Sequence, residues 1–301
     1  MRKRIPLSIA LLLFAVIFAA VLQPAAHFTV TAAAPSPPAP ATALEAQVDK
    51  WIKAISNQPD FHSWQEAEAV ITPLGPGQHG WLVSLRHNKQ DVGYMIVHAK
   101  EDGGFSLGEY GTGSQPIFNA NTLYQSLVQQ DLIPSYEYAI KKPLQLERLY
   151  VHPLLAAWKW LAPDGQIYYM DAWTGDVLPV SDEDWQAAVK QQSATSTLSI
   201  KAGQIVKAKL NDSFDLFASL PWLTKTPLAA QAQLENQLDR KQQIRFAAEM
   251  FDSRILFIWL VIGYHRWDTS DLFIAFSQDD STYGIRYIPL HALTKQGKFF
   301  N

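Results

Sequence analysis

The spacing of apolar residues changes along the chain, and each spacing predicts a different kind of element. Apolar side chains recur every three or four positions between residues 42 and 56, which predicts an amphipathic helix. Helices are also predicted over 119–130 and 181–191, where an Asn and a Ser are placed to cap the first turn. Two further helices are predicted at 63–72 and 229–239.

Strands are predicted where apolar and polar positions alternate between turn-forming residues. They form three groups along the chain: 81–85, 93–99 and 105–110; 146–151, 154–161, 166–171 and 176–180; and 197–200, 204–210, 243–250, 254–264, 271–278 and 283–289. The apolar run from Ile255 to Tyr264 is too short to cross a bilayer as a helix, since that takes about 20 residues. It is predicted to be a central strand buried on both faces.

These elements predict an α+β fold of antiparallel sheets with flanking helices. A first α+β region covers 42–192, a polar joint lies at 193–196, and a β-rich C-terminal domain covers 197–301. A Pro-rich spacer at 35–41 precedes the first region. Because proline-rich segments are stiff and extended, the spacer predicts a short, defined distance between the fold and whatever precedes it.

The N-terminal segment has the pattern of an export signal or a membrane anchor. Basic residues 2–4 precede an apolar run over 5–22, and no Lys or Arg follows until Lys50. This asymmetry predicts a cytoplasmic N-terminus and an extracytoplasmic remainder. Cleavage near Ala32 would give a secreted protein, whereas retention of 1–34 would give a single-pass cell-membrane protein. Both outcomes remain open, and either makes the fold extracytoplasmic.

Composition narrows the chemistry that the chain can perform. Of 301 residues 48% are hydrophobic and 12% aromatic, which indicates a folded, core-rich protein. The net charge is −3, and no basic face is evident, so nucleic acid is not an expected partner. The absence of cysteine excludes disulfides, thiolate zinc sites and a cysteine nucleophile. The histidines show no metal-site spacing, so neither a metal nor another cofactor is expected.

Two short stretches resemble known families. Residues 166–178 are an aromatic strand followed by Asp-Ala-Trp-Thr-Gly-Asp-Val, where Asp171 is placed to accept N–H groups of a turn and Gly175 to supply a positive φ. This stretch resembles the closing hairpin of a PepSY-type domain. Residues 93–97 and 107–113 resemble strands in the pro-segments of streptopain-like cysteine proteases. The resemblance implies an extracytoplasmic module that inhibits or regulates a protease, although 197–301 reads as a β-rich domain rather than as a protease.

Aromatic residues crowd the predicted hairpin at 154–178. The candidate binding residues there are Trp158, Trp160, Tyr168, Tyr169 and Trp173. If exposed, they would form a surface for a peptide, a glycan or a membrane interface. If the helix at 181–191 covers them, they belong to the core. The sequence leaves both alternatives open.

The sequence therefore predicts a non-enzymatic, membrane-proximal module that binds a protein or peptide, with an envelope protein or cell-surface protease as the expected partner. One alternative is an envelope hydrolase whose site is assembled from distant residues such as His98, Glu109 and His152. Another is a cell-wall or lipid-binding sensor with an exposed aromatic cluster. An enzyme requires a deep pocket where at least two of those three side chains meet. A peptide-binding module requires an apolar groove or an open sheet edge.

Overall fold

The computed structural model places residues Ala41–Asn301 in one compact unit. It describes residues 43–75, 79–101, 103–193, 203–215, 225–228, 231–277 and 284–301. The predicted signal or anchor segment, the spacer, most of the joint at 193–196 and the strand predicted at 197–200 lie outside the described residues. Within those ranges, no helix is both long enough and apolar enough to span a bilayer.

Four of the five predicted helices are present among the described residues, and the short helices at 136–141 and 290–294 were not predicted. The described helices are α1 (Ala43–Ile55), the 3₁₀ helix η1 (Pro59–Glu66), α2 (Ala120–Gln129), α3 (Tyr136–Lys141), α4 (Asp182–Ser193), α5 (Gln231–Asp239) and α6 (Leu290–Thr294). Asn119 caps α2, because its side-chain oxygen accepts hydrogen bonds from the backbone N–H groups of Asn121 and Thr122. The helix predicted at 63–72 is wrong: η1 ends at Glu66, and the following residues form a strand.

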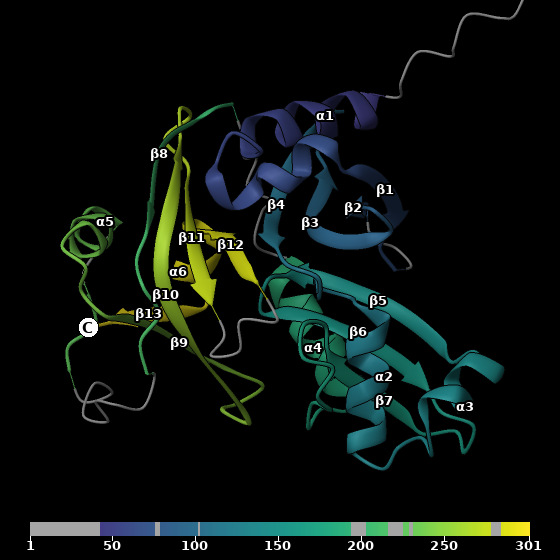
Figure 1. The fold of residues 1–301 in the computed structure, drawn as a ribbon. Helices are drawn as coiled ribbons and strands as arrows, with labels where there is room; N and C mark the ends of the chain where they lie inside the picture. Colours follow the sequence, from purple (N-terminus) through teal and green to yellow (C-terminus); the bar gives the residue numbers. More distant parts are fainter. Residues whose placement is uncertain are drawn as a thin grey trace, which may run out of the picture. The chain divides into compact units, whose positions relative to one another are not determined.

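Most strands belong to one antiparallel sheet, sheet A, which has ten strands in the described residues (Figure 1). In spatial order these are β1 (Glu68–Pro73), β2 (Gly80–His87), β3 (Gln90–Ala99), β4 (Phe105–Thr112), β12 (Ile285–Pro289), β11 (Leu272–Ser277), β10 (Ile255–Trp267), β9 (Ile244–Met250) and β13 (Gly297–Phe300), with β8 (Ile205–Leu210) also paired to β10. The predicted fold class, α+β with antiparallel sheets, is confirmed.

The remaining described strands form a smaller antiparallel sheet, sheet B. Its order is β5 (Gln145–His152), β6 (Leu155–Leu161) and β7 (Ile167–Asp171). Side chains of α2 and α3 share a hydrophobic cluster with Trp158 and Trp160 of β6. Trp185 of α4 shares another cluster with Ala157. Since alternate residues of a strand point to opposite faces, helices cover both faces of this sheet.

Sheet A joins the two regions that the sequence divides at 193–196. Strand β4 of the first region pairs with β12 of the second through Gly111 with Arg286 and Tyr110 with Tyr287. Residues Ala41–Asn301 accordingly form one compact unit. The joint therefore separates two stretches of sequence that share a sheet.

Strand β10 is central, as predicted, but only its second half is buried on both faces. Residues from Leu260 to His265 are buried, whereas Leu256 is 49% exposed. The reason lies in the pairing. Strand β11 begins to pair at Leu260, so the first half of β10 has a described neighbour, β9, on one side only.

Candidate functional site

The predicted aromatic cluster is divided between two packed faces of sheet B. Trp158, Trp160, Tyr169 and Trp173 are at most 4% exposed, and Tyr168 is partly buried. The ring of Trp160 stacks on Tyr168 with centroids 5.4 Å apart. On the opposite face, Tyr169 stacks on Trp185 of α4 at 4.9 Å. These rings fill the core rather than gather in an exposed patch.

The turn after β7 has the predicted geometry, but the strand predicted at 176–180 is wrong, because only an isolated bridge between Met170 and Val177 forms there. The Asp171 carboxylate accepts hydrogen bonds from the backbone N–H groups of Trp173 and Thr174, each at 2.8 Å. Gly175 has a φ of 78°, which a residue with a side chain rarely adopts. Burial raises the pKa of Asp171, while the two N–H groups oppose that shift. Both residues therefore shape the turn.

A fully buried ion pair joins β4 to β12. The Glu109 carboxylate accepts from Nε of Arg286 at 3.0 Å and from its Nη2 at 2.8 Å. It also accepts from the hydroxyls of Tyr94 at 2.8 Å and Tyr150 at 2.9 Å. Burial first, and the charge of Glu109 second, raise the pKa of both tyrosines, so their hydroxyls stay protonated and donate.

Arg286 also ties sheet A to the loops of sheet B. Its guanidinium lies 5.1 Å from the ring of Trp173 and 5.2 Å from the ring of Trp259. Its Nη2 donates to the carbonyl of Pro153 at 2.7 Å. Sequence reasoning named Glu109 but missed Arg286. The sequence feature that could have identified Arg286 is a single cationic residue within the otherwise apolar strand at 285–289.

The three side chains of the hydrolase alternative lie around this ion pair without forming a reactive arrangement. The ring of His98 lies 5.5 Å from the ring of Tyr150, and Nδ1 of His152 accepts from the backbone N–H of Leu154. Burial lowers the pKa of each histidine to about 4, with Arg286 adding to the effect at His152. Glu109 is fully buried and already accepts four hydrogen bonds. These are the properties of a structural centre.

An open groove lies beside one of the predicted aromatic residues, Trp158. Its volume is about 400 Å³. It is lined by residues from the end of β1 and the following loop, from α2, from β5 and from β6: Pro73, Gly75, Ala120, Tyr124, Leu146, Glu147, Arg148 and Trp158. We call this the β5 groove. It combines aromatic, aliphatic and charged side chains in an open depression.

One side of the β5 groove is a strand edge. Among the described strands β5 pairs only with β6, and the carbonyl of Arg148 accepts from the backbone N–H of Gly75, which lies outside sheet B. The backbone groups of Arg148 therefore point away from β6. Because antiparallel pairs alternate, the N–H and C=O of Leu146 point the same way. No described residue hydrogen-bonds to them.

Arg148 is half-buried in the groove and has only neutral partners in the described part of the chain. Its Nη1 donates to the hydroxyl of Thr72 at 2.9 Å, and its guanidinium lies 5.5 Å from the ring of Trp158. No carboxylate of the described residues lies within ion-pair distance. Burial alone lowers the pKa of this arginine, and no neighbouring anion raises it.

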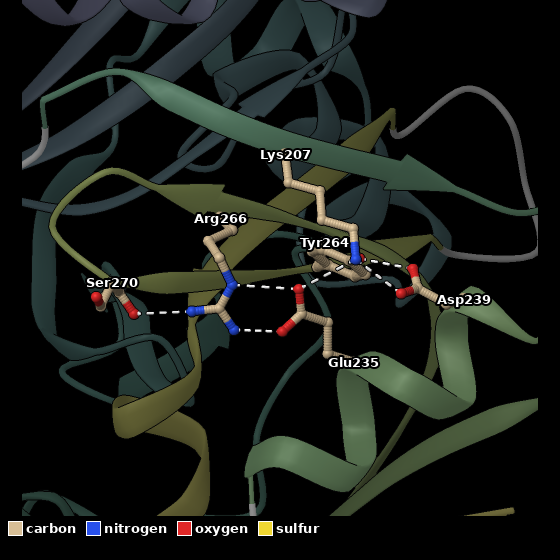
Figure 2. A network of polar contacts seen from close by, with 6 residues as sticks. All are labelled: Lys207, Glu235, Asp239, Tyr264, Arg266 and Ser270. Atoms are coloured by element: carbon tan, nitrogen blue, oxygen red, sulfur yellow. Dashed lines mark hydrogen bonds and ion pairs between the residues drawn. The ribbon is translucent and has the colours of Figure 1, made fainter.

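A second polar cluster lies on α5, β8 and β10 (Figure 2). Unlike Arg148, its cationic side chains are paired with carboxylates. Arg266 pairs with Glu235, and Lys207 pairs with Asp239 at 2.7 Å and with Glu235 at 3.5 Å. The hydroxyl of Tyr264 donates to Asp239 at 2.6 Å. We call these residues the α5 clasp. Each charge drawn there has an opposite charge beside it, so the clasp holds α5 against the sheet.

The fold and the β5 groove define an α+β protein with a groove along an open strand edge. No family model, no curated protein and no solved structure matches the chain. The resemblance to PepSY-type and streptopain-type modules stays a prediction.

Proposed function

We propose that this chain is a binding module for an extended peptide segment of a protein partner, and that the segment docks along the β5 groove. The observation that carries the proposal is the outward-facing N–H and C=O of Leu146 beside an open depression. A peptide can add a strand to such an edge, with its backbone supplying affinity and side-chain pockets supplying specificity.

The groove offers both kinds of contact. A strand placed roughly 4.8 Å from β5 would form hydrogen bonds with Leu146, each contributing about 0.5–1.5 kcal/mol net. Its side chains would meet Tyr124 of α2 and the aliphatic side chain of Leu146. The Glu109 centre lacks comparable access, which favours binding over hydrolysis.

The cellular setting of the proposal comes from the sequence. The basic and apolar pattern at 1–34 supports an extracytoplasmic module, held close to the membrane if that segment is retained. The resemblance at 166–178 and 93–113 supports a cell-surface protease as the partner. A protease inhibited or guided through an extended segment is consistent with docking at a strand edge.

A proline substitution tests the strand edge directly. Leu146→Pro removes an N–H that points away from β6, so it leaves the pairing of β5 with β6 intact. Peptides of 12 random residues, displayed on phage with a free C-terminus, are selected on the full-length protein. The selected peptides should lose binding to the variant while its circular dichroism stays that of the wild type.

A matched change elsewhere serves as the control. Val206→Ala alters an exposed residue of β8, another strand with a described partner on one side, and should leave binding unchanged. The proposal fails if no peptide is enriched on the wild-type protein. It also fails if enriched peptides bind a folded Leu146→Pro variant as tightly as the wild type.

A further inference from the structure

Four described arginines pair with a carboxylate of the fold. Arg286 pairs with Glu109, Arg266 with Glu235, Arg254 with Asp184 and Arg86 with Asp91. Arg148 differs, because its described contacts are a hydroxyl and an indole ring. A guanidinium that is partly removed from water is best compensated by an anion that it can bind through two N–H groups.

The surroundings of Arg148 orient it for such an anion. The ring of Trp158 lies against the guanidinium, and the hydroxyl of Thr72 accepts from Nη1. Within the described residues, Nε and Nη2 have no hydrogen-bond acceptor. These two groups form the edge of a guanidinium that binds a carboxylate with two parallel hydrogen bonds.

The same position marks where a docked strand must stop. The backbone N–H of Gly75 already donates to the carbonyl of Arg148 at 2.6 Å. An added strand can therefore pair with Leu146 but cannot continue past Arg148. The segment has to end or turn away beside the guanidinium, so a charge at that point of the peptide meets it.

Resting on the proposed function, we infer that the peptide carries a carboxylate at this stop, and that Arg148 binds it. The carboxylate comes either from the C-terminus of the partner chain or from an Asp or Glu side chain. Both sources present the same planar anion to the same edge of the guanidinium, and the experiment separates them.

The test uses the full-length protein and synthetic peptides with the sequences enriched on it. Each peptide is made with a free or an amidated C-terminus, and with each acidic residue kept or replaced by its amide. Loss of the recognised carboxylate should weaken binding to the wild type roughly 10- to 100-fold, the range expected for a charged hydrogen-bonded pair. A loss on amidation indicates the chain end, and a loss on side-chain replacement indicates Asp or Glu.

Three variants assign the effect to Arg148. Arg148→Gln should weaken binding of the acidic peptide by a similar factor and remove the difference between the charged and neutral peptides. Arg148→Lys, which keeps the charge, should retain part of that difference. Arg86→Gln removes a surface guanidinium already paired with Asp91 and should change nothing.

The two proposals fail in different ways. If peptides bind the wild type with no preference for a carboxylate, the inference is overturned and strand docking stands. If no peptide binds, both are overturned. Should Arg148→Gln not fold, the comparison of free and amidated peptides on the wild type still decides the inference.

Discussion

Two of the described arginines, Arg286 and Arg148, lie over tryptophan rings, and they differ in whether a carboxylate pairs with the guanidinium. Arg286 lies over the rings of Trp173 and Trp259 and forms an ion pair with Glu109. Arg148 lies against Trp158, and its guanidinium donates a hydrogen bond to the hydroxyl of Thr72. The first arrangement uses a charge to join two sheets, and the second leaves a charge facing an open groove. The difference separates a structural ion pair from a candidate recognition site.

The largest expected effect comes from breaking the buried pair. Glu109→Gln removes one charge and leaves Arg286 buried without its anion, which should lower the free energy of unfolding by about 3–5 kcal/mol. Urea unfolding of the full-length protein measures the loss. Glu68→Gln, at an exposed position of β1, should change it by less than about 0.5 kcal/mol. A loss below about 1 kcal/mol for Glu109→Gln would remove the basis of the comparison.

Truncating Trp173 measures how much its ring stabilises the buried Arg286. Trp173→Ala removes a buried ring from the guanidinium of Arg286 and should cost about 3 kcal/mol of unfolding free energy. Trp173→Phe retains an aromatic face and should cost less. If Trp173→Ala instead leaves the unfolding curve unchanged and abolishes peptide capture, Trp173 acts in binding, which is one of the two alternatives that the sequence leaves open.

The α5 clasp provides an intermediate case in which the charges are paired but partly exposed. Glu235→Gln should lower the free energy of unfolding by about 1 kcal/mol, since paired charges near the surface contribute little. The hydrogen bond from Arg266 is the main cause that lowers the pKa of Glu235 in the folded protein.

The lowered pKa of Glu235 determines how the free energy of unfolding changes with pH. A depressed folded-state pKa gives stability that is present above the unfolded value of about 4.3 and is lost as pH falls through the folded value. The free energy of unfolding should therefore fall more steeply for the wild type than for Glu235→Gln on going from pH 5 to lower pH. If the free energy of unfolding depends on pH in the same way for both proteins, the ionisation of Glu235 does not contribute to stability.

The smallest expected effect is at Arg148. Since no described anion depends on this side chain, Arg148→Gln should change the free energy of unfolding by less than about 1 kcal/mol. Thermal and urea unfolding of the variant measure this change. A loss above about 2 kcal/mol would mean that Arg148 is structural like Arg286, and the contrast between them would disappear.

Local features were predictable from the sequence, and long-range ones were not. The Asn119 cap, the Asp171 turn and the positive φ at Gly175 depend on neighbouring residues, so their residue types indicate them directly. The segment 63–72 failed because its spacing fits a helix as well as a strand. Its structure is decided by the pairing of β1 with β2, which lies beyond the local pattern.

In the candidate site, too, local features could be predicted from the sequence and long-range contacts could not. Trp158 was identified because aromatic residues are conspicuous in a hairpin. Arg148 was missed because Thr72 and Gly75, which define its environment, lie on a separate strand and loop. Arg286 was missed for the same reason, since its carboxylate is 177 positions away in the chain.

The pairing of β4 with β12 has a consequence for the order in which the chain acquires its structure. As the polypeptide is synthesised, β1 to β4 are complete long before residues 285–289 exist. Until then β4 is an open edge, and unpaired edges promote association between chains. Contacts so distant in sequence also form slowly. During synthesis there is therefore an interval in which β4 lacks its partner strand and is exposed to pairing with other chains.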